Sequence, residues 1–258
     1  MASFLEARRN NGRWLVRIED IDPPREVAGS AEGIIADLVR LGMEPDGEIL
    51  YQSTRFQAYE DATDRLISQG LAYWCGCSRS DLPSSGVYPG TCRNGIPRGR
   101  EPRSVRLRTS HVPVIFDDRL QGTQQVSLSE TGGDFVIRRA DGLPAYQLAV
   151  TVDDGFQEIS DIVRGADLLD STPRQVFLQQ QLDLSTPGYA HIPVVLDKDG
   201  RKLGKRFDSD PVKSLEPVAA IRAALEFLGH QPPGVNSLGE IWHWALENWD
   251  INKAGKKT

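Results

Sequence analysis

The three cysteines of the chain, Cys75, Cys77 and Cys92, have a spacing that could hold a metal ion. Two of them lie in the sequence CGC, and the third follows Tyr88 in the sequence YPGTC. Thiolates are ligands that zinc selects, and four ligands complete its tetrahedron. The odd number of cysteines argues against a disulfide framework. The residues alone leave two interpretations open: a zinc site completed by Tyr88, His111 or water, or three unrelated thiols packed as small apolar groups.

A basic cluster, RKLGKR at residues 201–206, is conspicuous because the chain has a formal net charge of −6. Lys202 and Lys205 could meet the negative charge of a polyphosphate, and the alternative is a solvated turn that happens to be positive. The overall acidity does not argue against nucleic acid, since binding needs only a local basic surface. A polyphosphate site would also need a second group of phosphate-binding residues elsewhere in the chain.

Three further residues could bind a small charged ligand. Glu19 lies in RIEDIDPPR at the carboxyl end of a predicted strand, where open α/β sheets bind ligands, and its carboxylate suits an ammonium group. Tyr146 falls on the first turn of a predicted helix, and Arg164 ends another predicted strand, where its guanidinium suits a carboxylate or phosphate. Taken singly, the ordinary interpretations are a solvated loop at residues 17–25, a core tyrosine and a surface salt bridge.

The composition is that of an ordinary globular protein. The chain has 258 residues, of which 39% are apolar and 26% charged, enough for one large α/β domain or a core domain with an attachment. No apolar run approaches the ~20 residues needed to span a membrane. The first residues, MASFLEARRNNGRW, differ from a signal peptide because charge follows the apolar residues at once. We therefore expect a cytoplasmic protein with no membrane partner.

The apolar patterns predict strands that alternate with helices, which favours a mostly parallel sheet. Strands are predicted at 13–20, 71–77, the start of 134–155, 157–165 and 189–196, and helices at 30–41, 53–70, the later part of 134–155, 172–182 and over 207–258. Pro144 is expected in the first turn of its helix. The core-facing positions expected on the first two helices are Ile34, Ile35, Leu38, Leu41, Phe56, Tyr59, Leu66 and Ile67. Residues 78–103, rich in Gly, Pro, Ser and Arg, predict an irregular insertion between two halves.

Five motifs in register resemble the class I aminoacyl-tRNA synthetases of the glutamyl branch, and more closely the short glutamyl-queuosine tRNA(Asp) synthetases that lack an anticodon-binding domain. The motifs are RIEDIDPPR, CGC with YPGTC, ADGLPAYQLAVTVDD, DIVRGADLLDSTPRQ and KDGRKLGKR. The resemblance extends from Phe4 to about Trp249.

This resemblance implies a Rossmann-like α/β catalytic domain with a parallel sheet, a zinc-containing insertion and a C-terminal helical region that contacts the tRNA stem. The corresponding division is 1–72 and 141–196 for the catalytic domain, 73–140 for the insertion, and 197–258 for the lysine loop and helices. The implied activity is activation of glutamate with ATP, assisted by Mg²⁺, and transfer of glutamate to queuosine in tRNA(Asp) by a monomer.

The resemblance also implies a role for each candidate residue. Glu19 and Tyr146 would hold the α-ammonium group of glutamate, and Arg164 would pair with one carboxylate. The zinc ligands would be Cys75, Cys77, Tyr88 and Cys92. Lys202 and Lys205 would belong to a variant of the family's Lys-Met-Ser-Lys loop and meet the charge that builds on ATP as pyrophosphate leaves, with Lys205 binding ATP.

One part of the family pattern is missing from the sequence. Members begin with a strand of the type Arg-Phe-Ala-Pro-Ser-Pro-Thr-Gly and a His-x-Gly-His-like element, whereas here Met1 aligns within the helix that follows. We expect that a start upstream supplies this segment and that the 258-residue form does not activate glutamate. The alternatives are a fragment of an ordinary glutamyl-tRNA synthetase and a non-catalytic tRNA-binding paralogue.

Overall fold

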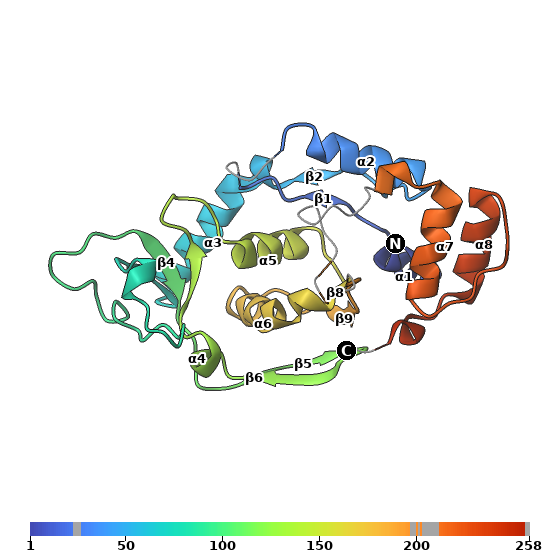
Figure 1. Ribbon diagram of the computed structural model, residues 1–258. Coiled ribbons are helices and arrows are strands. Elements are labelled where there is room, and N and C mark those ends of the chain that lie inside the picture. Colours follow the sequence, from blue (N-terminus) through green and yellow to red (C-terminus); the bar gives the residue numbers. More distant parts are fainter. Residues whose placement is uncertain (23–26, 197–199, 201, 203–211, 256–258) are drawn as a thin grey trace.

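The computed structural model describes residues 1–22, 27–196, 200, 202 and 212–255. The molecule is elongated, with the cysteine-containing part at one end and the last two helices at the other (Figure 1). The α/β class expected from the sequence is confirmed. The sheet arrangement differs from the expectation, because the strands form three separate sheets rather than one mostly parallel sheet.

The first part of the chain contains a short parallel pair of strands. Its elements are α1 (Ala2–Arg9), β1 (Arg17–Ile18), α2 (Ser30–Arg40), β2 (Leu50–Tyr51), the 3-10 helix η2 (Gln52–Arg55) and α3 (Phe56–Ser68). The strand predicted at 13–20 is reduced to two residues, because only Arg17 and Ile18 face residues of β2. The segment before β1 still runs beside the chain that leads into β2, since the carbonyl groups of Trp14 and Val16 accept backbone N–H groups of residues 46 and 50.

Three details of the predicted helices are wrong. Ile34 on α2 is 45% exposed and Phe56 on α3 is 36% exposed, because each helix is covered on a narrower stripe than the apolar pattern suggested. Tyr59 and Leu66 of α3 are buried as predicted. Pro144 does not lie in a helical turn, since the helix after it begins at Tyr146 and the intervening Ala145 is extended.

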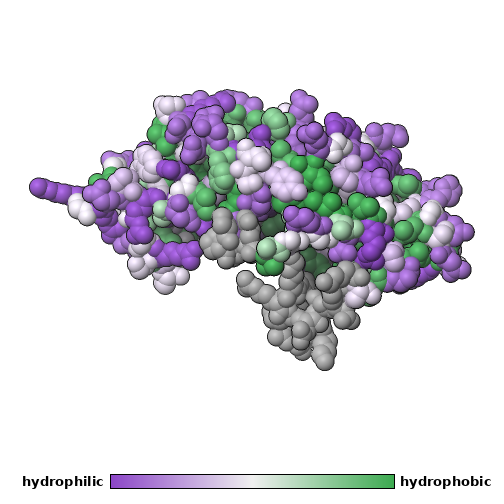
Figure 2. Space-filling view, turned by 90° about the horizontal axis from the view of Figure 1, so that it is seen from above, coloured by the Kyte–Doolittle hydropathy of each residue, from purple (hydrophilic) through white to green (hydrophobic). Residues whose placement is uncertain are grey.

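The irregular segment predicted at 78–103 separates two strands of an antiparallel sheet. This sheet has the order β3-β4-β7, formed by β3 (Ala72–Cys75), β4 (Ser104–Leu107) and β7 (Phe135–Arg138). The long connection contains only a short 3-10 helix, η3 (Arg79–Asp81), within the predicted segment. Figure 2 shows that hydrophilic residues dominate the face of this end that is turned to the viewer.

A hairpin from within residues 73–140 joins the second half of the chain. It consists of β5 (Val114–Asp118) and β6 (Gly122–Val126), followed by α4 (Leu128–Thr131). Its sheet has the order β6-β5-β9-β8, in which β5 and β6 are antiparallel while β5-β9 and β9-β8 are parallel. The sheet is mixed because a hairpin pairs with strands that are connected by a helix. The domain boundaries at 72, 140 and 196 stay a prediction.

The second half supplies the remaining strands and two packed helices. Its elements are α5 (Tyr146–Phe156), β8 (Asp161–Gly165), η4 (Ala166–Ser171), α6 (Thr172–Gln181) and β9 (Gly188–Ile192). Helix α6 begins at Thr172 as predicted, with Pro173 in its first turn, where the missing N–H is not needed. Leu148 of α5 and Leu178 of α6 are fully buried in a core that also includes Tyr59, Leu107 and Ile137.

The last part of the chain packs against the first helix. It comprises η5 (Val212–Ser214), α7 (Pro217–Phe227), α8 (Leu238–Asn248) and η6 (Ile251–Ala254). The side chains of Glu216 and Ser237 cap α7 and α8 by accepting backbone N–H groups. A second core joins both helices to Leu5 of α1. No helix in the described ranges combines the length and the apolar character needed to cross a membrane.

Candidate functional site

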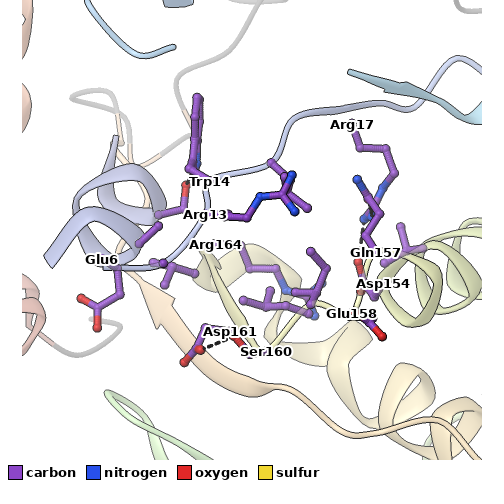
Figure 3. A pocket seen from close by; sticks show the side chains of 18 of the residues that line it. Glu6, Arg13, Trp14, Arg17, Asp154, Gln157, Glu158, Ser160, Asp161 and Arg164 are labelled. Carbon is purple, nitrogen blue, oxygen red and sulfur yellow. Dashed lines mark hydrogen bonds and ion pairs between the residues drawn. The ribbon is translucent and has the colours of Figure 1, made fainter. Parts of the chain in front are cut away.

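A cavity of about 760 Å³ lies between α1, the segment that leads into β1, helix α5 and strand β8. Its lining contains all three residues predicted to bind glutamate, namely Glu19, Tyr146 and Arg164. Arg17 and Asp154 also line it. Figure 3 shows Arg164 reaching in from β8, while Arg17 extends from the opposite wall toward Asp154. The cavity therefore presents both signs of charge to a ligand.

Arg164 is a cation held by neutral groups. Its Nε donates to Nε2 of His191 at 3.1 Å, and its NH2 donates to Oγ1 of Thr172 at 2.8 Å and to Oε1 of Gln175 at 2.6 Å. Within the described part of the chain, no carboxylate forms an ion pair with Arg164. Its charge is therefore available to an anion that enters the cavity.

Glu19 follows β1, and burial raises its pKa above the ordinary value of 4.5, as do the nearby carboxylates of Asp154 and Asp153, while Arg17 opposes this effect. The side chain is 42% exposed because it faces the cavity, and its contact with Arg17 is long, at 3.9 Å between NH2 and Oε1. A carboxylate that is weakly paired and partly deprived of water is suited to gain from a cationic ligand.

Arg17 has a better partner than Glu19. Its NH2 lies 2.8 Å from Oδ1 of Asp154, and its NH1 donates to Oε1 of Gln157 at 2.9 Å. Asp154 is only 6% exposed, and burial raises its pKa. The Arg17–Asp154 pair connects the segment at β1 to α5. It therefore holds in place the wall of the cavity that includes Glu19.

Tyr146 is the first residue of α5 and is 36% exposed. Burial first, and then the charge of Glu19, raise the pKa of its hydroxyl, which therefore stays protonated near neutral pH. The charge of Arg164 acts in the opposite direction and lowers this pKa. Tyr146, Glu19 and Arg164 all line the same cavity.

The basic cluster is described only in part. Nζ of Lys202 donates to Oδ2 of Asp167 at 2.5 Å, so this lysine lies just beyond the end of β8 that carries Arg164. Gly165 permits this arrangement, because Asp167 lies against the position that a side chain there would occupy. Lys205, the predicted ATP-binding residue, lies outside the described residues.

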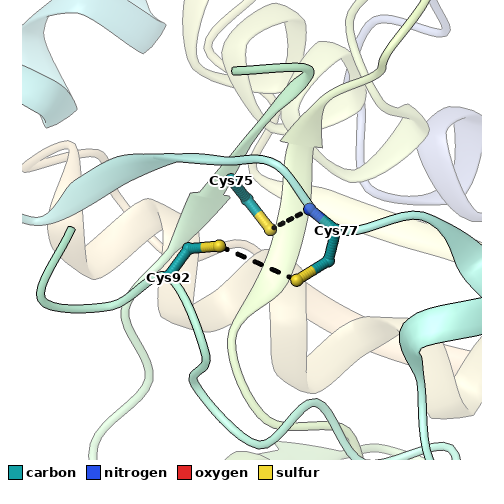
Figure 4. Close-up of side chains that lie close together, drawn as sticks. All are labelled: Cys75, Cys77 and Cys92. Atoms are coloured by element: carbon teal, nitrogen blue, oxygen red, sulfur yellow. Dashed lines mark hydrogen bonds between the residues drawn. The ribbon is translucent and has the colours of Figure 1, made fainter. Parts of the chain in front are cut away.

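The three cysteines converge at the end of the antiparallel sheet (Figure 4). All are buried, and their sulfur atoms lie within 4.8 Å of one another. The hydroxyl of Tyr88 is 3.4 Å from Sγ of Cys75 and 3.9 Å from Sγ of Cys77. The four groups named by the resemblance are therefore neighbours. The three thiols are ligands that zinc selects, whereas burial and the hydrogen bond with Cys75 raise the pKa of the Tyr88 hydroxyl, which opposes the phenolate form.

Two arginines contact the sulfur atoms. Nε of Arg106 donates to Sγ of Cys75 at 3.3 Å, and NH1 of Arg100 donates to Sγ of Cys77 at 3.4 Å. Burial by itself raises the pKa of the Cys75 thiol. Hydrogen bonds from Tyr88, from a backbone N–H and from Arg106 outweigh burial and lower this pKa to about 7. The thiolate form that a metal requires is thereby favoured at this residue.

His111, the alternative fourth ligand, is not among the residues that surround the sulfur atoms. Its Nδ1 lies 3.3 Å from Oγ of Ser129, on the exposed side of the chain. The candidates left by the sequence thus reduce to Tyr88 or a solvent molecule.

Sequence reasoning missed four residues of the cavity and its support: Arg17, Asp154, Asp118 and His191. Arg17 and Asp154 lie inside the quoted motifs but pair across elements that are distant in the chain. Asp118 bonds His191, at a separation of 73 positions. A charged residue at the end of a strand was the available signal for Asp118, and the histidine within the apolar run YAHIPVV was the signal for His191.

Comparison with protein families gives a match over most of the chain. The family described as "tRNA synthetases class I (E and Q), catalytic domain" matches residues 1–85 and 92–230. The six residues between these ranges include Tyr88.

Similar proteins span nearly the whole chain. The Glutamyl-Q tRNA(Asp) synthetase of Chromobacterium violaceum is 48% identical over 261 residues, covering 98% of this chain and 88% of that protein. The protein of the same name from Pseudomonas putida is 50% identical over 262 residues, covering 100% of this chain and 88% of that protein.

Two solved structures have a similar fold. The glutamate-tRNA synthetase of Elizabethkingia anophelis has a TM-score of 0.78 at 25% identity, and the alignment covers 100% of this chain but 63% of that one. A glutamate tRNA ligase from Elizabethkingia meningosepticum in complex with its amino acid has a TM-score of 0.79 at 25% identity, covering 98% of this chain and 61% of that one. This chain thus spans less than two thirds of either. Together with the family match and the close relatives, they establish that the chain belongs to the class I tRNA synthetases of the glutamyl and glutaminyl branch, within the family of the glutamyl-Q tRNA(Asp) synthetases.

Proposed function

We propose that the cavity binds glutamate for activation with ATP and for transfer to the queuosine base of tRNA(Asp). The names of the relatives at about 48% identity support the reaction and the nucleic acid. The observation that carries the amino-acid assignment is Arg164, a cation in the cavity wall whose bonds go to neutral groups. A second carboxylate distinguishes glutamate from most amino acids, and Arg164 is the group suited to recognise it.

The rest of the cavity suits the amino-acid end of the ligand. The carboxylate of Glu19 attracts the α-ammonium group, and the Tyr146 hydroxyl can accept from or donate to it. Attack of the α-carboxylate on the α-phosphorus of ATP expels pyrophosphate, and negative charge builds on the phosphate oxygens. Lys202, which lies beyond the strand end that carries Arg164, together with Lys205 would stabilise that charge.

The test of the amino-acid assignment is Arg164→Ala. Loss of a buried, charge-assisted contact should weaken glutamate binding by about 3 kcal/mol, measured by calorimetric titration. Arg222→Ala is the matched control, because Arg222 is also half-buried and bonded to neutral acceptors, the carbonyls of Pro233 and Val235, but lies away from the cavity. Equal glutamate affinities in the two variants would refute the assignment.

We further propose that Cys75, Cys77, Tyr88 and Cys92 hold one zinc ion with a structural role. Four protein ligands close the tetrahedron and leave no position for a substrate, which is typical of structural zinc sites. Elemental analysis of the purified protein should find about one zinc per chain, and Cys77→Ser should lower this content. A folded wild-type protein free of metal would contradict the proposal.

The nucleic-acid partner is proposed to meet the end of the molecule that carries the cysteines. Between residues 78 and 108 the acidic side chains are Asp81 and Glu101, and the arginines that are not buried are Arg79, Arg93, Arg98, Arg100, Arg103 and Arg108. A locally basic surface on an acidic protein attracts phosphate groups, and the attraction weakens with salt.

The substrate position is tested with tRNA(Asp) whose terminal adenosine has been removed. Transfer to queuosine should persist on this RNA and should vanish on tRNA(Asp) that carries unmodified guanosine. The reverse pattern, in which the shortened RNA is inert and the queuosine is dispensable, would identify ordinary charging of the 3′ end. Binding of the RNA without transfer of glutamate to either position would favour a non-catalytic tRNA-binding protein.

A further inference from the structure

The contact between Arg164 and His191 determines where His191 carries its proton. Arginine has only donors, so its Nε–H at 3.1 Å requires Nε2 of His191 to be an unprotonated acceptor. His191 is fully buried, and a charged imidazolium would turn a second N–H against the guanidinium. The ring is therefore neutral, with its single proton on Nδ1.

Asp118 lies where that proton must go. Its Oδ2 is 2.6 Å from Nδ1 of His191, and both side chains are fully buried. Its other oxygen, Oδ1, accepts three backbone N–H groups, from Leu120 at 3.0 Å, Gln121 at 2.8 Å and His191 at 3.3 Å. Burial, which raises the pKa of Asp118, is outweighed by these bonds and that of His191, so the carboxyl stays ionised.

The Asp118–His191 pair controls the direction of the guanidinium. Nε of Arg164 is used by His191, and NH2 is used by Thr172 and Gln175. Within the described part of the chain NH1 forms no hydrogen bond, and Arg164 lines the cavity, so NH1 is the nitrogen that remains for a ligand. A guanidinium that lost its Nε acceptor would be held only through NH2, by Thr172 and Gln175, and could pivot about that nitrogen. The direction of NH1 would then be less firmly fixed.

We propose that Asp118 and His191 are positioning residues for glutamate recognition: Asp118 holds His191 in the Nδ1–H tautomer, and Nε2 of that tautomer orients Arg164 toward the carboxylate of the ligand. Neither residue touches the ligand. This inference rests on the proposed function of the cavity and adds the support on which its selectivity depends.

The sharpest test is Asp118→Asn, which keeps the shape of the side chain. Because three backbone N–H groups surround the Oδ1 position, the amide oxygen must remain there and the NH2 group must face His191. That N–H can only donate to Nδ1, which moves the ring proton to Nε2. There it faces Nε–H of Arg164, and it competes with NH2 of Arg164 for Oγ1 of Thr172, which lies 3.1 Å from Nε2. Glutamate affinity should fall about tenfold or more, as expected when a buried donor loses its acceptor.

A double-mutant cycle separates this tautomer effect from general damage. In His191→Gln the side-chain carbonyl can accept from Arg164 without help from Asp118. Asp118→Asn should therefore weaken glutamate binding strongly in the wild-type background and by less than about threefold in the His191→Gln background. Equal losses in both backgrounds would show that Asp118 serves the fold alone and would overturn the inference.

His230→Gln provides the matched control. His230 is also buried, and its Nε2 also accepts an N–H, from the backbone of Asp250 at 3.1 Å, but it belongs to the C-terminal part of the chain. This change should leave glutamate affinity within about twofold of wild type, whatever it does to stability. A tenfold loss of affinity in this control would refute the inference.

Nitrogen-15 spectroscopy provides a readout that needs no ligand. The wild-type protein should show His191 protonated at Nδ1, together with an Arg164 Nε–H signal protected from exchange that disappears in Arg164→Lys and becomes exposed in Asp118→Asn. A proton on Nε2 of His191 in the wild type would refute the inference even if glutamate binds. Failure of the wild type to bind glutamate would instead contradict the proposed function, while the spectra would still decide the orientation of Arg164.

Discussion

At the scale of single residues, the cavity is suited to a charged ligand because the protein leaves two of its charged groups, Glu19 and Arg164, incompletely paired. Glu19 and Arg164 were recognisable in the sequence because each stands at the end of an apolar run, where a parallel strand delivers side chains to a ligand. Arg17 was not recognisable as their support, because its bond to Gln157 crosses 140 positions of the chain. Such a pairing follows from packing and leaves no local pattern.

The raised pKa of Glu19 predicts how glutamate binding depends on pH. The ionised form attracts the ligand's ammonium group, so affinity should fall as the pH drops through a value above the ordinary 4.5. Glu19→Gln should bind glutamate more weakly at neutral pH and should lose this acid limb. Calorimetric titrations of both proteins across the acid range measure the difference, and an unchanged limb in Glu19→Gln would assign the titration to another group, such as Asp154.

At the scale of elements, the sequence predicted the regular helices and the strands that carry the site, but not the partners of every strand. Helix α6 and strand β8 were found because their periodicity and end signals are local. Residues 73–140 are predicted to form the insertion, and Asp118 of the hairpin β5–β6 within this range pairs with Tyr189 of β9. That pairing brings Asp118 to His191. The sequence does not predict the pairing of β5 with β9, and for this reason it does not predict the contact between Asp118 and His191.

The register of β3 and β4 predicts a role for Arg106 in the metal site. Arg106 lies opposite Tyr73 on β3, and this places its guanidinium beside the sulfur of Cys75 and 3.8 Å from the centroid of the Tyr88 ring. Arg106→Gln should reduce zinc affinity about 10- to 100-fold, because a group that supports a ligand is lost.

Competition with a chelator measures this change. Arg108→Gln is the control, because Arg108 is near in sequence but stacks on Tyr73 and donates to the carbonyl of Arg93 rather than to sulfur. Zinc retained equally well by the two variants would contradict the role of Arg106.

At the scale of the whole molecule, the cavity wall depends on contacts between the two ends of the described chain. Glu6 of α1 is 6% exposed and lines the cavity. Its carboxylate accepts from Nε1 of Trp249 at 2.7 Å and from NH1 of Arg119 at 2.6 Å. No local sequence pattern predicts these bonds, because they depend on how the parts of the chain around Glu6, Arg119 and Trp249 pack together.

Trp249→Phe should therefore affect both stability and the site. The smaller ring leaves a cavity, and a buried carboxylate loses a donor. The lost donor alone should lower the free energy of unfolding by about 1–3 kcal/mol. Urea unfolding measures the stability, and glutamate titration should show weaker binding because α1 is less firmly held. Trp244→Phe on α8 is the control, and an equal loss of stability in the two variants would show that the bond to Glu6 contributes nothing specific.

The bond between Glu6 and Trp249 joins two residues that the ribosome synthesises at well separated times. The two residues are 243 positions apart. At roughly 5–20 residues per second, the tryptophan leaves the ribosome on the order of ten to fifty seconds after the glutamate. During that interval α1 has no α8 to cover its apolar side and is open to chaperones and proteases. Helix α1 therefore gains this contact only from a residue made 243 positions later, and the cavity wall is completed only when translation has passed residue 249.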